Sequence, residues 1–518
     1  MPTLDWIGKD KVINHHMDVP YRVLDAKYEY GEADGNMIIH GDNLSALKSL
    51  LPEYEGKIRC IYIDPPYNTG NEGWVYNDNV NDPRIKKWLG EVVGSEGEDL
   101  SRHDKWLCMM YPRLKLLHKL LAENGVIFIS IDDREQVNLR VICNEIFGEK
   151  NFLGQFIWQK RTSPDMRKLV STAHEYVCAY CKDIEHLSEA INKVALSEED
   201  EKNYKNPDND PRGPWASSDF TAQGFRPNQM YEITTPGGAK YTPPDGRCWK
   251  NIESEFQKQV EEGRMWFGTD GKGIPRRKTY LYEREGKNVW TWWDNKSVGH
   301  TQEATKEIAK IFGSPSIFDY PKPVRLIQRI IQIATDKDSI ILDSFAGSGT
   351  TAHAVLNMNK DGGNRKFILI EMMDYADSIT AERVKRVING YGEGKKAVPG
   401  TGGGFTFYEL GEALLDGEYL NENVPLDKIR SYVYFTETKQ TVTDKADEPY
   451  FLGEHFGTAY YFYYDKNEVT TLDREFLHTV KTKADSYVIY ADKCILSDEE
   501  LEKFRITFKK IPRDITRM

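Results

Sequence analysis

The stretch Ile61-Tyr62-Ile63-Asp64-Pro65-Pro66-Tyr67 joins a buried apolar run to a rigid polar turn. The run Ile58–Ile63 predicts a buried strand that ends where the two prolines begin. Proline fixes φ and has no N–H, so this turn is stiff and its carbonyls remain free to accept hydrogen bonds. Asp64 and a free carbonyl can together grip an amino group, with Tyr67 laid against a flat ring. An ordinary strand end with an aspartate turn cap fits the same residues, so this stretch alone leaves both interpretations open.

The composition sets the broad class of the protein. A chain of 518 residues is long for one hydrophobic core, so two to four domains are expected. The net charge of −12 argues against a general nucleic-acid coat protein, although it leaves room for a local basic groove. Seven cysteines, an odd number, indicate a reducing cytoplasmic compartment. The sequence shows neither a signal peptide nor an 18-residue apolar run, and we expect no membrane segment.

The chain up to residue 182 alternates predicted strands and helices. A strand at 37–40, a turn at 41–43 and a helix from 45 to 51 lead back to the strand before Asp64. A right-handed crossover between parallel strands places Asp42 and Asp64 on the same rim of one sheet. The whole alternation predicts a doubly wound α/β sheet with an antiparallel edge, whereas residues 1–35 are interpreted as an ordered arm. The long polar connection from Asn68 to about residue 100 predicts a mobile substrate loop.

The domain boundaries follow changes in composition. Residues 1–182 and 311–395 are assigned to two parts of one α/β domain. Residues 183–310 carry Pro/Gly clusters, isolated aromatics and short alternating runs, which predict an inserted β-rich domain. Residues 396–518 are interpreted as a small C-terminal α/β domain for dimerisation or partner contact.

A basic and aromatic segment lies inside the predicted insertion. Residues 271–290 hold six Lys or Arg against two Glu, with tyrosine and tryptophan between them. A solvated surface loop fits this pattern, but the interleaved aromatics favour a nucleic-acid face. The predicted contacts with DNA are Arg276, Arg277 and Lys278, together with Lys160 and Arg161 between two strands of the first domain.

A second glycine-rich turn follows the predicted strand at 339–342. Its sequence is Asp343-Ser-Phe-Ala-Gly-Ser-Gly-Thr-Thr351, and a helix follows it. Glycines let the backbone approach a ligand, and a helix N-terminus offers free N–H groups to a carboxylate. Glu371, at the end of the next strand, can accept both ribose hydroxyls of a nucleoside, and Asp42 can accept from an adenine amino group. This set fits S-adenosylmethionine better than NAD.

No metal site is expected. The pair Cys178 and Cys181 forms a lone CxxC within an apolar run, which favours two small core residues over metal ligands.

The two turns together resemble the amino-methyltransferases of DNA. DPPYNTG at 64–70 and FAGSGTT at 345–351, with the catalytic motif first, are similar to the β class, whose Rossmann-like sheet is circularly permuted. TPPDGRCW (242–249), GRMWFGTDG (263–271), IPRRKTYL (274–281) and FKKIPRDI (508–515) resemble the modification subunits of type III restriction–modification systems. The cofactor residues implied by this resemblance are Asp42, Lys322, Asp343, Phe345, Gly347, Gly349, Thr350 and Glu371, with Lys322 beside the methionine end.

The resemblance implies a sequence-specific methyltransferase acting on the N6 amine of adenine in double-stranded DNA. Asp64 and the Pro65 carbonyl would hold the amine, and Pro66 keeps the turn rigid. The base would be flipped out of the duplex onto Tyr67. Trp158 is a weaker candidate for the opposite wall, because an ordinary core tryptophan is favoured there. Methylation of cytosine N4 and a non-catalytic DNA-recognition subunit stay open as alternatives, and the implied partners are a second copy of the chain and a helicase–nuclease restriction subunit.

Overall fold

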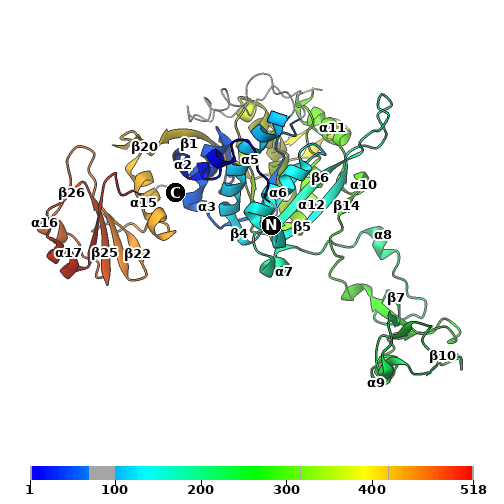
Figure 1. Cartoon of the computed structure of the whole chain (residues 1–518). Helices are drawn as coiled ribbons and strands as arrows, with labels where there is room; N and C mark the ends of the chain where they lie inside the picture. The colour runs from blue at the N-terminus through cyan, green and yellow to red at the C-terminus, as the bar shows by residue number, and fades with distance from the viewer. Residues whose placement is uncertain (1–2, 69–99, 315–316, 418, 516–518) are drawn as a thin grey trace. The chain divides into compact units, whose positions relative to one another are not determined.

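The computed structural model describes residues 3–68, 100–314, 317–417 and 419–515. These residues form two compact units (Figure 1). Residues 1–191 with 290–518 form the main unit, and residues 192–289 form the inserted unit. The observed insertion is shorter than the predicted 183–310 at both ends. The connection predicted as a substrate loop lies largely at 69–99, outside the described residues.

A ten-stranded sheet forms the centre of the main unit. Its strands, in spatial order, are β1 (Arg22–Gly31), β19 (Gly404–Ala413), β2 (Met37–His40), β16 (Lys366–Glu371), β15 (Ile340–Asp343), β3 (Ile58–Ile63), β4 (Leu121–Ile131), β6 (His174–Cys181), β5 (Phe152–Gln159) and β14 (Trp292–Trp293). The strands from β19 to β4 are parallel to one another, whereas β6 is antiparallel to both β4 and β5. The predicted doubly wound α/β sheet with an antiparallel edge is confirmed.

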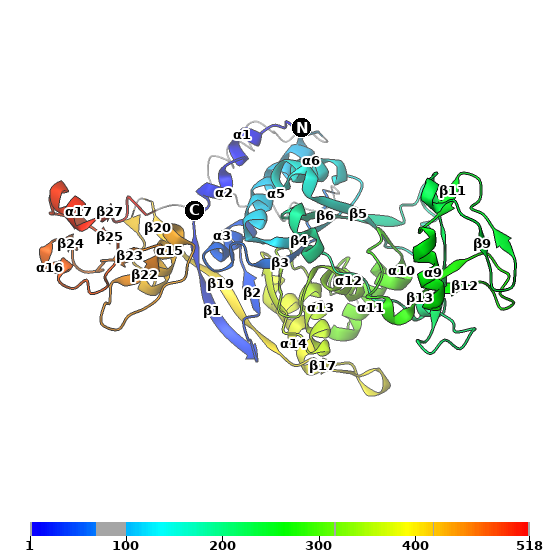
Figure 2. The same ribbon diagram turned by 90° about the horizontal axis from the view of Figure 1, so that it is seen from below.

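Helices cover both faces of this sheet (Figure 2). One face carries α3 (Asn43–Tyr54), α5 (Leu100–Leu120) and α6 (Gln136–Phe147), and the other carries α12 (Val324–Ala334), α13 (Thr350–Met358) and α14 (Glu382–Asn389). The strand β3 is buried along its whole length because helices cover both of its faces, which explains its continuous apolar sequence. In α12, Ile327, Ile330, Ile331 and Ala334 recur at intervals of three and four residues and are buried, so one stripe of this helix faces the core.

The helices that follow β3 and β15 lie on opposite faces of the sheet. From β3 the chain passes through α5 to β4, whereas from β15 it passes through α13, on the other face, to β16. The carboxyl ends of β2, β16, β15 and β3 lie along one rim, as the pairs His40↔Glu371, Asp343↔Leu369 and Ile61↔Leu342 show. Open α/β sheets bind ligands just outside such a rim, at the point where the crossovers diverge.

Both ends of the chain depart from the predicted domain boundaries. Residues 22–31 form the edge strand β1, which pairs with β19, and not a separate arm. Residues 404–413 form β19 within the central sheet, so the boundary predicted at 396 falls too early. Similarly, β14 pairs with β5, so the main unit resumes before residue 310. These strands are short or partly exposed, and their sequence patterns are correspondingly weak.

The C-terminal part of the main unit carries its own four-stranded sheet. Its strands are β22 (Phe451–His455), β23 (Thr458–Phe462), β25 (Ser486–Ala491) and β27 (Ile506–Lys510). The helix α15 (Leu426–Thr438) buries Tyr432, Val433 and Phe435 in the large core that it shares with the central sheet. The remaining regular elements of the main unit are α1 (Lys9–Val12), α2 (His15–Asp18), α7 (Leu187–Ala190), α10 (Asn295–Val298), α11 (Thr301–Phe312), β17 (Gly390–Tyr391), β18 (Val398–Pro399), β20 (Leu415–Asp416), β21 (Tyr419–Leu420), β24 (Thr471–Leu472), α16 (Arg474–Leu477), β26 (Lys493–Cys494) and α17 (Asp498–Phe504).

The inserted unit is built mainly from short strands, as predicted. Its elements are α8 (Glu198–Glu201), β7 (Trp215–Asp219), β8 (Thr221–Gln223), β9 (Ile233–Thr234), β10 (Lys240–Tyr241), β11 (Arg247–Trp249), α9 (Glu253–Glu261), β12 (Met265–Trp266) and β13 (Arg276–Tyr280). It has a small core of its own, in which Phe220, Trp249 and Phe256 pack against one another.

The described residues hold neither a clustered metal site nor a helix that could span a membrane. Across the described residues, no three His, Cys, Asp or Glu side chains gather as a metal site. Cys178 and Cys181 are buried in β6, which confirms their interpretation as core residues. Within the same residues, no helix combines the length and the apolar character needed to cross a membrane.

The buried strand β3 should dominate the stability of the main unit. Ile61 is fully buried, so Ile61→Ala should lower the free energy of unfolding by about 2–5 kcal/mol, because it leaves a cavity in the core. Thermal unfolding followed by circular dichroism would show a lower midpoint. The exposed Val137→Ala on α6 serves as the control and should leave the midpoint unchanged. Equal midpoints for the two variants would contradict the central role of β3.

Candidate active site

The turn after β15 is organised by a buried carboxylate. The Phe345 N–H donates to Oδ1 of Asp343 at 3.1 Å, and the Thr351 hydroxyl donates to Oδ2. Both oxygens of Asp343 are therefore engaged inside the turn, and the side chain is buried. In the structure the carboxylate of Asp343 shapes the turn that would receive the cofactor, and its predicted contact with the cofactor stays a prediction.

Glu371 holds the same turn from the neighbouring strand. Its Oε2 accepts from the Gly347 N–H at 2.8 Å, and its Oε1 accepts from the Met373 N–H at 3.0 Å. The glycines are required here, because φ is +52° at Gly347 and +79° at Gly349. A Cβ at Gly347 would lie 3.2 Å from Cζ of Phe318. The turn thus forms a close-fitting cradle at the N-terminus of α13.

Burial changes the protonation of both acids at this rim. Burial raises the pKa of Asp343 to about 7, although hydrogen bonds from Thr351 and the Phe345 N–H oppose the shift. Burial also raises the pKa of Glu371 to about 7, against the backbone N–H groups of Met373 and Gly347. These acids lose their protons near neutral pH, and any group that donates a hydrogen bond to Glu371 would favour its charged form.

The turn after β2 joins the same site. Asp42 caps α3, because its Oδ1 accepts from the Ser45 N–H at 2.8 Å. Asn43 donates through Nδ2 to the Ser344 carbonyl and so links the two turns. The buried Asn43 Oδ1 and Ser344 Oγ have no hydrogen-bond partner among the described residues. Buried polar atoms are almost always paired, so these two atoms and the glycine cradle fit a polar ligand such as S-adenosylmethionine.

The turn after β3 is arranged around the carboxylate of Asp64. The Tyr67 hydroxyl donates to Oδ1 at 2.7 Å, and Nζ of Lys322 donates to Oδ2 at 2.6 Å. Nζ of Lys322 also donates to the Tyr67 hydroxyl oxygen at 3.0 Å. The Thr350 hydroxyl, at the start of α13, donates to the Lys322 carbonyl at 3.3 Å. Lys322 therefore connects the Asp64 turn to the glycine-rich turn.

A second buried acid completes this group of charges. Oε2 of Glu175 lies 3.7 Å from Nζ of Lys322, and Oε1 lies 2.7 Å from Nζ of Lys160. Burial alone would raise the pKa of Glu175, but the two lysines outweigh it and lower that pKa. Burial alone would lower the pKa of Lys322, but Asp64 and Glu175 outweigh it and raise that pKa. Lys322 is consequently a buried ammonium at neutral pH, held by two carboxylates.

Further side chains support the Asp64 turn from α5 and its surroundings. Trp106 donates through Nε1 to the Pro66 carbonyl at 2.7 Å. Asn68, with φ of +59°, donates through Nδ2 to the fully buried Glu135, which also contacts Nδ1 of His103 at 2.7 Å. The turn is thus fixed on both sides, and within the described residues no hydrogen bond reaches the Pro65 carbonyl.

The structure therefore brings together most of the residues that the sequence assigned to the active site. Tyr67, Asp64 and Lys322 are in direct contact, and Lys322 reaches Thr350 through its backbone. Trp158 is buried and donates to the Gly299 carbonyl, and its ring centroid lies 5.9 Å from Nζ of Lys322. Sequence reasoning missed Glu175, and the signal available for it was a lone acid within the apolar strand β6.

The predicted DNA contacts differ strongly in their exposure. Lys160 is engaged with Glu175, whereas the side chain of Arg161 is 45% exposed and lies 3.7 Å from Asp165. In the inserted unit Arg277 is exposed, and Arg276 donates to the Ser217 hydroxyl.

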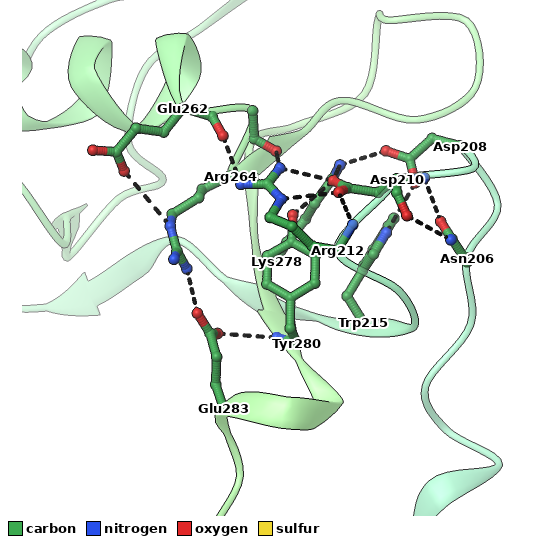
Figure 3. A network of polar contacts seen from close by, with 11 residues as sticks. Asn206, Asp208, Asp210, Arg212, Trp215, Glu262, Arg264, Lys278, Tyr280 and Glu283 are labelled. Atoms are coloured by element: carbon green, nitrogen blue, oxygen red, sulfur yellow. Dashed lines mark hydrogen bonds and ion pairs between the residues drawn. The ribbon is translucent and has the colours of Figure 1, made fainter.

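Lys278 is a correction to the sequence prediction. It is buried, and its Nζ contacts the carboxylates of Asp208 and Asp210 (Figure 3). Tyr280 and Arg212 also donate to Asp210, so this network holds strand and loop together inside the unit. Alternating strand residues point to opposite faces, and the basic run therefore sends Lys278 inwards and Arg277 outwards.

The chain is similar to known DNA methylases. The DNA methylase family model N6_N4_Mtase matches residues 58–382. The type III restriction–modification enzyme StyLTI Mod subunit of Salmonella typhimurium is 37% identical, over 74% of this chain and 62% of that protein. The type II methyltransferase M.KpnI of Klebsiella pneumoniae is 34% identical, over 66% of this chain and 81% of that protein. A putative DNA modification methylase from Thermus thermophilus, solved with S-adenosyl-L-methionine, is 14% identical with a TM-score of 0.33, over 72% of this chain and 99% of that chain. The chain spans 62% to 66% of the length of the Mod subunits StyLTI, EcoPI and EcoP15I.

The raised pKa of Glu371 predicts a specific dependence of stability on pH. The folded protein keeps this proton up to about pH 7, whereas an unfolded glutamic acid releases it near its ordinary pKa of 4.5. The folded state binds more protons in between, so Glu371 lowers the stability as the pH rises from about 4.5 to about 7. Glu371→Gln removes this contribution. The melting temperature of the variant relative to wild type should therefore increase across that range in thermal unfolding.

An exposed glutamate provides the control for this measurement. Glu393→Gln should show a constant difference from wild type over the same pH range. A constant difference for Glu371→Gln as well would contradict the assignment of the titration to Glu371.

Proposed function

The chain belongs to the N6_N4_Mtase family of DNA methylases, and we propose that it methylates the N6 amine of adenine in a specific sequence of double-stranded DNA, using S-adenosylmethionine. One observation carries the proposal. Lys322 ties the Asp64-Pro65-Pro66-Tyr67 turn to the start of α13, so the amine-binding turn and the glycine cradle lie next to each other. A methyl donor in the cradle would then face an amine held by Asp64.

Different residues at the rim would bind different parts of S-adenosylmethionine. When bound, this cofactor supplies an electrophilic methyl group on its sulfonium sulfur. The free N–H groups at the start of α13 would receive its carboxylate, close to Gly347 and Gly349. Glu371, which already accepts from the backbone N–H groups of Gly347 and Met373, would accept from its ribose hydroxyls. Asp42 would accept from its adenine amino group through Oδ2, since Oδ1 caps α3.

The Asp64 turn would hold and orient the target amine. The lone pair of an exocyclic amine is delocalised into the ring, so this nitrogen is a poor nucleophile. Hydrogen bonds from the amine to Asp64 and to the Pro65 carbonyl would draw the nitrogen towards a tetrahedral geometry and aim its lone pair. Alignment for in-line attack matters more here than a strong base. The amine lies inside the duplex, so the base has to be flipped onto Tyr67.

Adenine is favoured over cytosine by the first residue of the catalytic turn. An aspartate at the position of Asp64 resembles the N6 enzymes, whereas a serine is typical of the N4 enzymes. A non-catalytic recognition subunit is disfavoured, because Asp64, Tyr67, Gly347 and Glu371 are all present and organised around the rim.

The remaining parts of the chain are assigned by their surfaces and by the relatives. We assign target recognition to the inserted unit, where Arg276 and Arg277 line one strand. The relatives named as Mod subunits of type III restriction–modification enzymes support a restriction subunit as a partner of this chain, and a second copy of the chain stays a prediction.

Loss of the Asp64 carboxylate should abolish methyl transfer. Asp64→Ala removes the main acceptor for the amine, and incorporation of label from S-adenosylmethionine into DNA should fall by at least about a hundredfold. Asp465→Ala, at an exposed turn in the C-terminal part, is the control and should retain wild-type incorporation. Equal incorporation by Asp64→Ala and wild type would eliminate the role assigned to Asp64. Mass spectrometry of digested product DNA should show N6-methyladenine, and N4-methylcytosine there would decide for the alternative.

The exposed arginine of β13 should contribute to DNA affinity. Arg277→Ala should weaken DNA binding and reduce the slope of log K against log salt by about 1, with an unchanged melting temperature. Lys278→Met should leave the salt slope of DNA binding unchanged, because Lys278 is buried between Asp208 and Asp210 and does not reach the surface. This variant should lower the melting temperature of the inserted unit. A salt slope unaffected by Arg277→Ala would exclude this strand from the DNA-binding surface.

A further inference from the structure

Asp64 and Lys322 place a hydrogen-bond acceptor directly beside a donor. Oδ2 of Asp64 and Nζ of Lys322 are 2.6 Å apart, while Oδ1 is occupied by the Tyr67 hydroxyl. The side chains of Asp64 and Lys322 are 25% and 10% exposed, so the pair is partly open to a ligand. A ligand bound at Asp64 would therefore lie within reach of the Lys322 ammonium.

This arrangement matches one kind of nucleobase edge. The Watson–Crick edge of adenine presents the N6 amine, a donor, beside N1, an acceptor. Guanine presents the reverse order, with the O6 acceptor beside the N1–H donor. Flipped bases are read by hydrogen bonds to this edge. A carboxylate oxygen beside an ammonium is complementary to adenine and repels guanine.

We propose that Lys322 is a specificity-determining residue that donates from Nζ to N1 of the flipped adenine while Asp64 holds the N6 amine. This inference rests on the proposed function and adds a base contact to it. The resemblance to the family places Lys322 beside the methionine end of the cofactor. In the structure, its backbone carbonyl accepts from Thr350 at the start of α13, whereas its ammonium faces Asp64, Tyr67 and Glu175.

The ammonium has a donor suited to this contact. Lysine carries three N–H groups, of which one reaches Asp64 and another reaches Tyr67. The third faces Oε2 of Glu175 at 3.7 Å, which is an ion-pair distance and too long for a hydrogen bond. It can therefore turn to a ring nitrogen without giving up an existing hydrogen bond.

The surrounding charges keep Lys322 as a donor that retains its proton. The titratable groups facing it are Asp64, Tyr67 and Glu175, and Glu175 is shared with Lys160. Two carboxylates favour the ammonium form, so Lys322 would hydrogen-bond to N1 without transferring a proton to it.

The test uses oligonucleotides that carry the target sequence, which is first identified by sequencing methylated bases in an expression strain. The target adenine is replaced by 1-deazaadenine, which keeps the amine but has C–H in place of N1. Wild type should lose about tenfold to a hundredfold in kcat/KM on this substrate, the loss expected for one hydrogen bond to a charged group. Lys322→Met should lose at least this factor on adenine, because Asp64 also loses its partner, and should show little further loss on 1-deazaadenine.

Three controls separate the N1 contact from other effects of the analogue and of the variant. The analogue 7-deazaadenine, altered on another edge, should affect wild type and Lys322→Met equally. Lys322→Arg keeps a hydrogen-bond donor, so it should again show part of the wild-type loss in kcat/KM between adenine and 1-deazaadenine. Calorimetry with S-adenosylmethionine should give similar affinities for wild type and Lys322→Met, since the side chain faces the base.

The inference fails on several outcomes. Equal rates of wild type on adenine and 1-deazaadenine would overturn it without any variant, even if Lys322→Met does not fold. An equal 1-deazaadenine penalty in wild type and Lys322→Met would overturn it too, as would loss of S-adenosylmethionine binding in that variant. A wild-type enzyme that methylates no adenine at all would instead remove the proposed function, and this inference with it.

Discussion

The buried ammonium of Lys322 is the constraint on which the site depends. A charge out of water is costly unless it is paired, and Lys322 is paired with Asp64 at the end of β3 and Glu175 on β6. These residues come from segments that are far apart in the sequence. Each needs the others, because removing any one leaves an unbalanced buried charge. The position of Asp64 is thus fixed by long-range contacts as well as by its two prolines.

The sheet topology explains why these segments meet at one rim. The crossovers from β15 and β3 run on opposite faces, so their first turns diverge and leave the carboxyl ends uncovered. Buried acids then organise the exposed backbone there. Asp343 accepts from Phe345 and Thr351, and Glu371 accepts from Gly347, which holds the glycine turn open for a ligand.

Local sequence patterns were enough to predict the fold and the two turns. Features that depend on pairing between distant segments could not be predicted from them. The runs before Asp64, Asp343 and Glu371 are short, apolar and sharply bounded, so both the strands and their common rim follow from sequence. The edge strand β1 is polar on much of its length and takes its structure from β19, which lies almost 400 residues further along. The inward direction of Lys278 depends on the strand register of β13, which composition does not reveal. Glu175 looked like one acid in a strand, and only the tertiary contact with Lys322 gives it a role.

The hydrogen-bond donors and acceptors around Asp64 are complementary to only one type of nucleobase edge. Oδ1 of Asp64 accepts from Tyr67 and Oδ2 accepts from Lys322, so a second lone pair on Oδ2 and the Pro65 carbonyl are the two acceptors for the two N–H groups of the amine. Lys322 then adds one donor for the neighbouring ring nitrogen. Guanine in this place would set its O6 against two acceptors and its N1–H against an ammonium, so every contact would be repulsive. Cytosine has the same order of amine and ring nitrogen as adenine, and the polar groups alone would accept it. Between these two bases, the aspartate at position 64 resembles the N6 enzymes, and the size of the ring that stacks on Tyr67 adds to the choice, because a purine and a pyrimidine place the same edge at different depths.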